Sequence, residues 1–242
     1  SLDFVFNYAN PTSGTKVPRL AETNMAAATV SQNRTITFDN TGTADLNFQY
    51  DDAGKIRIDV SDAGNKGLSM ASVTTVVKPA KLIVASPDVD ADCVSGDANC
   101  TVFKKAGESF NLDVTATCSD GTTITSNYQQ NNIPLTINTV APVLGNPVSL
   151  GVTSVSIVGS DNGSHRISNQ SISEVGVFTV TATPPSYFGE TIPAAISANI
   201  GRFIPDHFEQ TVDNNGTLIG KHRLSGSCAM QDWAYSGQQT DG

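Results

Sequence analysis

Acidic residues and cysteines gather in one stretch, residues 88–100, which is the strongest candidate for a chemical role. Its aspartates alternate as in the first half of an EF-hand calcium loop; they are Asp88, Asp90, Asp92 and Asp97. An EF-hand requires glycine at the sixth position and glutamate at the twelfth, where this stretch has Cys93 and Asn99. The favoured interpretation is therefore a solvated acidic loop, with a looser calcium site that uses backbone carbonyls as the alternative.

The cysteines favour disulfide chemistry over metal binding. Cys93 and Cys100 flank a short loop rich in Gly, Asp and Asn, with no histidine close to either. Zinc sites need closely spaced cysteine pairs or a Cys/His set, and neither occurs. A Cys93–Cys100 bridge is therefore expected, which implies an oxidising compartment. Cys118 is expected either to be buried and free or to pair with Cys228; pairing is favoured, because exported proteins seldom leave two thiols idle.

No residue pattern indicates catalysis. Asp206 and His207 are adjacent, and neighbours on an extended chain point to opposite faces, so we expect a structural role for them rather than an acid–base pair. The sequence contains no Gly-x-Ser-x-Gly elbow, Walker loop, His-Glu-x-x-His motif or Rossmann glycine set. A non-enzymatic protein is therefore expected. A glycosidase is kept as the last of the functions considered, since the two carboxylates that it uses leave no sequence motif.

Composition excludes several classes of partner. The net charge of −9 over 242 residues opposes nucleic-acid binding, which depends on Lys and Arg contacts to phosphates. The same charge disfavours contact with an anionic membrane surface. No apolar run approaches the roughly 20 residues that a membrane helix needs. A charged fraction of only 15% argues against disorder and against a protein of long helices.

Alternating apolar residues predict an all-β chain of β-sandwich modules. Residues 46–50 and 56–60 alternate in this way on either side of a short loop with Gly54, which predicts a hairpin. Further strands are expected near residues 81–85, 108–117, 133–137, 150–158 and 175–183. Many short strands at a spacing of about ten residues are typical of sandwiches and barrels, and apparent repetition favours sandwiches.

Proline-containing segments are expected to join the modules. An extended run meets proline at Lys78-Pro79 and again in GRFIPDHF, residues 201–208. Proline cannot lie in a central strand, so these segments suit stiff linkers. The expected division is one β-sandwich module over residues 1–78, a second over 79–204, and the start of an incomplete third over 205–242. The sequence begins within a strand-like run, so an internal piece of a longer protein is expected.

Several short phrases occur in a characteristic order. They are FKKAGESF (103–110), EVGV (174–177), YFG (187–189) and GRFIPDHF, preceded by residues 46–50, DAGKI (52–56) and Lys78-Pro79. Together they resemble the repeated β-rich region of MshQ-type proteins. Those are bacterial surface proteins encoded with the mannose-sensitive haemagglutinin type IV pilus. The resemblance covers about residues 46–235, and GRFIPDHF is its most specific phrase.

The resemblance implies tandem immunoglobulin-like modules in an exported protein at the bacterial cell surface or outer membrane. It implies no catalytic residues. The implied partners are other modules of the same chain and pilus or envelope proteins. The expected function is thus a structural or adhesion segment of a pilus-associated surface protein, without a cofactor unless calcium binds.

The alternative is a module that binds carbohydrate or another surface ligand. Sugar sites usually combine an exposed aromatic face with neighbouring polar groups. The candidate contacts are the acidic loop and the rings of Tyr128, Tyr187 and Phe188.

Overall fold

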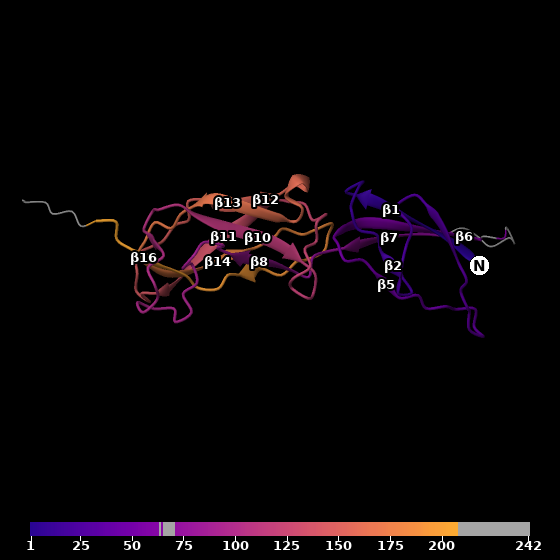
Figure 1. The fold of residues 1–242 in the computed structure, drawn as a ribbon, viewed down its shortest axis with the longest axis horizontal. Helices are drawn as coiled ribbons and strands as arrows, with labels where there is room; N and C mark the ends of the chain where they lie inside the picture. Colours follow the sequence, from indigo (N-terminus) through magenta and orange to yellow (C-terminus); the bar gives the residue numbers. More distant parts are fainter. Residues whose placement is uncertain (63, 65–70, 208–242) are drawn as a thin grey trace, which may run out of the picture. The chain divides into compact units, whose positions relative to one another are not determined.

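The computed structural model of the protein describes residues 1–62, 64 and 71–207. Its regular elements there are β-strands and one short 3-10 turn, η1 (Gly159–Asp161), which confirms the expected fold class (Figure 1). Among these residues we find no helix with the length and apolar character to cross a membrane. The chain divides into two compact units, Ser1–Pro205 and Asp206–Gly242, and all of the described strands lie in the first.

The N-terminal region, residues 1–78, forms two small sheets. Its strands are β1 (Leu2–Asn10), β2 (Arg19–Leu20), β3 (Thr23–Asn24), β4 (Ser31–Arg34), β5 (Phe48–Gln49), β6 (Gly54–Asp62) and β7 (Ala71–Val77). The sheet orders are β4-β1-β6-β7 and β3-β2-β5. Alternation along β1 places Phe4 and Phe6 on its buried face, where they join Leu20 of β2 and Ile56 of β6 in one core.

The predicted hairpin between residues 46–50 and 56–60 is wrong. β5 pairs with β2, whereas β6 pairs with β1 and β7. The residues between β5 and β6 are not a surface turn, because Tyr50, Asp52 and Ala53 are all buried. This burial shows that the segment passes from one sheet to the other through the interior. Within it, a carboxylate oxygen of Asp52 accepts a hydrogen bond from the backbone N–H of Ala53 at 2.8 Å.

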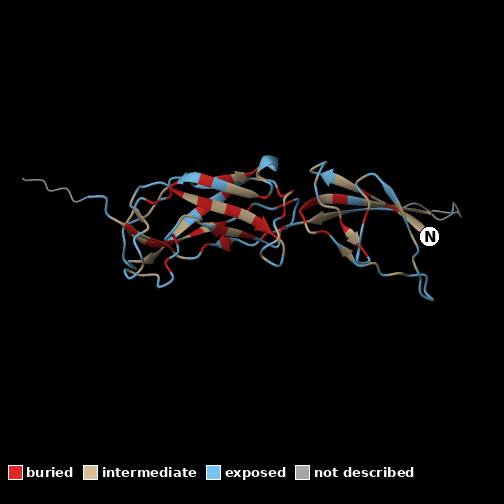
Figure 2. Ribbon diagram, viewed as in Figure 1, coloured by how far each residue is buried: buried red, intermediate tan, exposed pale blue. Residues whose placement is uncertain are grey.

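The central region, residues 79–205, forms a larger sandwich. Its strands are β8 (Lys81–Ala85), β9 (Lys104–Lys105), β10 (Phe110–Thr117), β11 (Gln130–Ala141), β12 (Ser154–Ile157), β13 (Ser164–Gln170), β14 (Gly176–Ala182), β15 (Ala195–Ile196) and β16 (Ile200–Ile204). The sheet orders are β13-β10-β8 and β12-β11-β14-β16-β9, with β15 added to β14. Side chains of both sheets share one core, and buried residues alternate with less buried ones along the strands (Figure 2).

The phrase expected to be a linker is largely part of this core. Residues 201–204 lie in β16, and Phe203 is only 1% exposed. Its ring contacts those of Phe103, Phe110 and Phe178, with centroids 5.4 to 5.9 Å apart. Pro205 follows the last residue of the strand, where its missing N–H breaks no ladder hydrogen bond.

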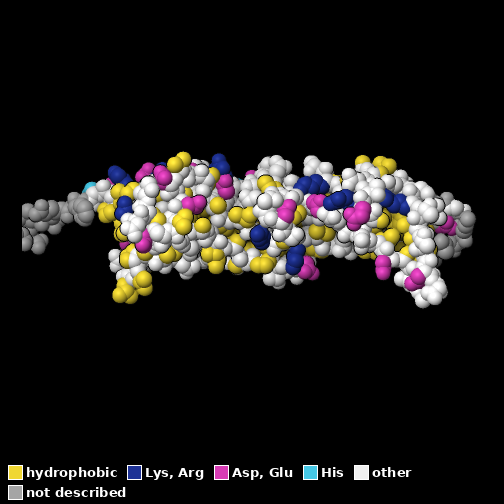
Figure 3. All heavy atoms as spheres, turned by 60° about the horizontal axis from the view of Figure 1, so that its bottom comes forward, with side chains coloured by type: hydrophobic (Ala, Val, Ile, Leu, Met, Phe, Trp, Pro, Cys, Tyr) yellow, Lys and Arg dark blue, Asp and Glu magenta, His cyan; other side chains and the backbone are white. Residues whose placement is uncertain are grey.

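One face of the molecule carries mostly uncharged side chains (Figure 3). On the face drawn in Figure 3, acidic and basic side chains are interspersed among many uncharged ones, and neither sign forms a continuous patch. The net negative charge is therefore not concentrated on that face.

Candidate functional site

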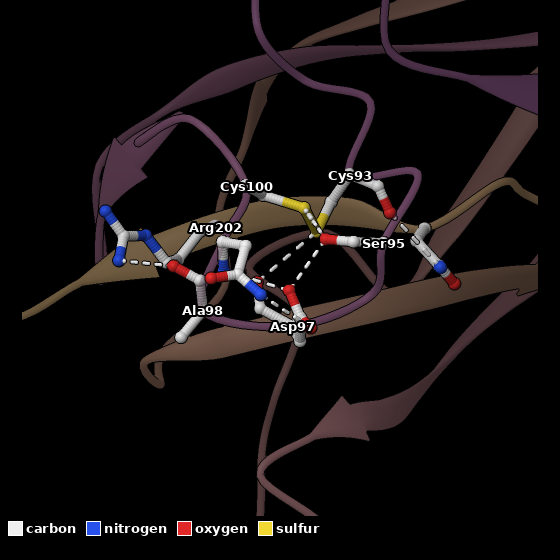
Figure 4. The surroundings of a disulfide bond; sticks show 8 residues. Cys93, Ser95, Asp97, Ala98, Cys100 and Arg202 are labelled. Atoms are coloured by element: carbon white, nitrogen blue, oxygen red, sulfur yellow. Dashed lines mark hydrogen bonds between the residues drawn. A yellow bond between two sulfur atoms is a disulfide. The ribbon is translucent and has the colours of Figure 1, made fainter.

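The predicted disulfide is present. Cys93 and Cys100 are bridged, with Cα atoms 5.4 Å apart. The loop that they close is held against the start of β16 by three hydrogen bonds (Figure 4). Asn199 donates from its side chain to the Cys93 carbonyl at 3.2 Å and accepts the Cys93 N–H at 2.9 Å, and Arg202 Nη1 donates to the Ala98 carbonyl at 2.9 Å. The bridge therefore fixes a surface loop on the central sandwich.

The aspartates of this loop are used separately rather than together. Asp88 accepts hydrogen bonds from Asn111, at 3.0 Å from the backbone N–H and 2.6 Å from the side chain. Hydrogen bonds from Ser95 and Asn99 hold the pKa of Asp97 below its ordinary value. Asp90 and Asp92 are exposed, as the burial of the loop shows. In the described part of the chain, no three His, Cys, Asp or Glu side chains converge into a metal-binding group.

Two of the three candidate sugar-binding rings are inaccessible. Tyr128 is fully buried and Tyr187 is 3% exposed, with their ring centroids 5.1 Å apart. Neither offers a face to a ligand in solvent. Phe188 packs against Tyr187 with its ring tilted, and the two ring centroids are 4.6 Å apart. It is 38% exposed, so it alone among the three has an accessible ring.

Cys118, near the end of strand β10, carries a free and partly buried thiol. Burial raises the pKa of this thiol, so its thiolate form is disfavoured. Cys228, its expected partner, lies outside the described residues.

The expectation that Asp206 cannot orient His207 is wrong. His207 Nδ1 lies 3.0 Å from Asp206 Oδ2 because the chain bends at Asp206 instead of continuing extended. Both side chains are more than half exposed, at 70% for His207 and 56% for Asp206. The contact joins two adjacent, solvated side chains, so the structural role expected for them stays a prediction.

The described residues hold a further polar cluster, one that the sequence did not indicate, and it connects the N-terminal and central regions. At its centre is Asp52, 1% exposed, which accepts the backbone N–H of Asn127 at 2.7 Å. The Asn127 side chain donates in turn to the Tyr50 hydroxyl at 3.3 Å. The second carboxylate oxygen of Asp52 is buried without a hydrogen-bond partner, and burial raises the pKa of this group.

Three lysines of the first 78 residues also end on groups of the central region. These contacts are Lys16 Nζ to the Ile124 carbonyl at 2.7 Å, Lys78 Nζ to the Thr191 carbonyl at 2.6 Å, and Lys55 Nζ over the Phe188 ring at 5.3 Å from its centroid. We call these three contacts, with the Asp52–Asn127 hydrogen bond, the joint. The ring of Phe188, the accessible one among the three candidates, is thus already in contact with the Lys55 ammonium group.

The joint also depends on a close backbone approach at Gly14. A Cβ atom there would lie 2.2 Å from Asn127 Nδ2 and 2.6 Å from Cε1 of Tyr8. A larger residue at this position would have to displace one of these two side chains.

Sequence reasoning missed the joint because its members carry no local pattern. Asp52 lies in a stretch whose composition is that of a turn, and its partner Asn127 is 75 residues away. The one sequence signal near it is the alternation of apolar residues that ends at Tyr50. In the structure, the burial of Tyr50 continues through Asp52 and Ala53, where a turn was expected.

Three models of one domain family match successive parts of the chain. The first is described as the first Ig-like domain of DUF6701, a domain of unknown function, and matches residues 1–73. The second and third DUF6701 domains match residues 78–170 and 174–241. These matches agree with the expected repeated β-rich region and with an immunoglobulin-like N-terminal domain.

No curated protein matches the chain. Among solved structures, one match is the crystal structure of a beta-glycosidase from Bacteroides vulgatus, at 14% sequence identity and a TM-score of 0.25. The match covers 81% of this chain but only 24% of the glycosidase chain. A similarity this weak carries no argument about fold or function.

Proposed function

This chain belongs to the DUF6701 family, and from that premise we propose that it is a non-enzymatic structural segment of a bacterial surface protein. In this role it holds neighbouring modules in a fixed relation. Its partners are other modules of a longer chain and envelope proteins. The link to a type IV pilus, and an adhesion role there, rest on the resemblance of phrases such as GRFIPDHF to MshQ-type proteins.

The joint is the observation that carries this proposal. Domains linked by a flexible segment move relative to each other by default, unless a substantial interface holds them. Here, buried and charged contacts connect the two regions, and Ala53 of the N-terminal region lies in the core cluster of the central one. Residues Ser1–Pro205 accordingly form one compact unit. Such a unit transmits orientation and force from one end of its chain to the other.

The disulfide supports export. Cysteine bridges persist in the periplasm and outside the cell, and are rare in the reducing cytosol. A bridge that fixes a surface loop, as Cys93–Cys100 does, also limits proteolysis at an exposed site of the central sandwich.

Distance measurements by electron spin resonance test the rigid joint. Spin labels at the exposed positions Asn40 and Ser168, on a Cys118→Ser, Cys228→Ser background, should give one narrow distance distribution. A broad distribution in the otherwise unaltered chain would refute the scaffold role, because modules that move freely cannot hold an orientation.

A matched variant shows whether the joint causes the rigidity. Replacing the three joint lysines by alanine should broaden the distribution, whereas Lys105→Ala on β9 of the central sandwich should leave it narrow. A glycan array with the unaltered protein addresses the rival function, and specific binding there would replace the scaffold by a ligand-binding role.

A further inference from the structure

Strand β7 forms an outer edge of the larger sheet of the N-terminal region. It pairs with β6 in an uninterrupted antiparallel register, from Val60 opposite Ala71 to Gly54 opposite Val77. It is the last strand in the order β4-β1-β6-β7, and no other described strand pairs with its outer side. Residues 71–74 are exposed, with Val73 at 60%. The backbone groups on the outer side of β7 thus have no strand partner in the described residues.

β7 also lacks the features by which proteins protect such edges. Its sequence, ASVTTVV, has no charge, proline or glycine, and five of its seven residues are β-branched. An exposed, regular and uncharged edge strand is a template for pairing with another strand. Three charged side chains of β6 lie opposite β7. Arg57 and Asp59 neutralise each other, because Arg57 Nη2 lies 2.7 Å from Asp59 Oδ2, and Lys55 places its Nζ over the Phe188 ring.

The other described sheet edges differ from β7. Short length limits pairing at β3, β4, β5, β12 and β15, which have two to four residues each. Charged side chains protect the rest, as edge lysines and arginines commonly do. These are Lys81 on β8, Lys104 and Lys105 on β9, and Arg166 on β13. Among the described edges, β7 alone combines length, regularity and neutrality.

We propose that β7 is an interaction surface that pairs antiparallel with β7 of a second copy of this chain. Each copy carries a net charge of −9, which opposes association of two copies, and this opposition is weakest along a neutral strip. In a pair centred on Thr74, Thr74 of one copy lies opposite Thr74 of the other. Val73 of each copy then lies opposite Thr75 of the other, and Ala71 opposite Val77. Such β-branched and Thr–Thr pairs stabilise antiparallel strands, and no like charges meet.

The same patch on both copies forms a twofold contact, which closes at a dimer and does not propagate into a fibre. The two sheets then continue into one another through main-chain hydrogen bonds, as in other cases of strand addition. This inference does not depend on the proposed scaffold role. If both hold, scaffold segments associate side by side in pairs.

Analytical ultracentrifugation of the full chain, from micromolar to millimolar concentration, tests the dimer. The unaltered protein should show a monomer–dimer equilibrium. Val73→Lys should weaken association by about tenfold or more, because it places a charge in each of two symmetric positions. Val73 is more than half exposed, so the folded monomer accommodates the lysine.

Ser168→Lys on β13 is the matched control, since it adds the same charge to an exposed edge position of the central sandwich. It should leave the association constant unchanged. Amide hydrogen exchange adds an independent readout: exchange at residues 71–77 should slow as the concentration of the unaltered protein rises. A protein that stays monomeric throughout, or a dimer that Val73→Lys leaves intact, overturns the proposal. Either result would assign the edge to another partner or to none.

Discussion

The two cores of the Ser1–Pro205 unit are of very different size. Among the described residues, the cluster of the N-terminal region contains six buried side chains, whereas that of the central region contains 23. One of those 23, Ala53, belongs to the N-terminal region by sequence. Small domains bury too little surface to be very stable on their own. The comparison therefore indicates that the N-terminal region depends on the joint, whereas the central region is self-sufficient.

The largest expected effect comes from cutting into the larger core. Phe203→Ala removes a ring that is 1% exposed and should lower the free energy of unfolding by about 3–5 kcal/mol. If the regions depend on each other unequally, the N-terminal region should lose its structure together with the central one. Differential scanning calorimetry combined with limited proteolysis measures both.

Phe6→Ala is the counterpart in the smaller core, where Phe6 is fully buried. It should cost a similar free energy within its own region but leave the central region folded. Loss of both regions in this variant would show that their dependence is mutual, and the inequality would be wrong.

Removing the disulfide should have the next largest effect. The double variant Cys93→Ser, Cys100→Ser removes the crosslink that restricts the unfolded chain. This change should lower the free energy of unfolding by about 2–3 kcal/mol. The loss should lower the melting temperature of the central region. The joint should be unaffected, since the bridged loop is held on β16. Chemical denaturation of the two proteins, in the absence of reductant, gives the difference.

A change at the centre of the joint should be smaller but more specific. Asp52→Ala leaves the buried N–H groups of Ala53 and Asn127 without an acceptor, which should cost about 1–3 kcal/mol. Asp52→Asn keeps an oxygen acceptor and should cost much less. If both variants lose the same stability, the hydrogen bonds of Asp52 do not hold the joint.

The smallest expected effect is a dependence on pH. Burial raises the pKa of Asp52 above its ordinary value of 3.8, so the folded state favours the neutral carboxyl. The stability that this group contributes is therefore complete below its ordinary pKa and is lost as pH rises through the folded-state pKa. Relative to Asp52→Asn, the unaltered protein should become less stable from acid to neutral pH in urea titrations. A difference that stays constant with pH would contradict the raised pKa.

Opposing groups make the comparison with Asp52→Asn necessary. Hydrogen bonds from Thr123 and Thr122 lower the pKa of Asp120, as those from Ser95 and Asn99 lower that of Asp97. Stability from these carboxylates is present above their ordinary pKa and is lost as pH falls. Their titration runs against that of Asp52, but it is common to both proteins and cancels in the difference.

Local patterns predicted the central region better than the N-terminal one. Strand β10 alternates Phe110, Leu112, Val114 and Ala116 with polar residues, and all four are buried as expected. The disulfide was also predictable, since its two cysteines close a short loop. Strand β13 was missed because its sequence, SHRISNQ, is mostly polar, and Ile167 is its one buried apolar side chain.

The joint and the β5–β6 crossing could not be predicted for a different physical reason. The same residues, DDAGK at 51–55, can form an exposed turn or a buried crossing, and only contacts with distant residues decide between them. Here the decisive partner is Asn127, whose N–H needs an acceptor in the interior. The candidate ligand site failed similarly, because the sequence does not show that Tyr128 and Tyr187 face each other inside the core.

One pairing in the central region bears on how such chains evolve. The second and third DUF6701 domain matches meet between residues 170 and 174, yet β11 on one side pairs with β14 on the other, from Leu135 opposite Ala182 to Ala141 opposite Val177. A duplication or recombination that copied only one of these domains would split a hydrophobic core and leave half of a sheet without its pairing partner. Selection should therefore retain the two as one inherited block.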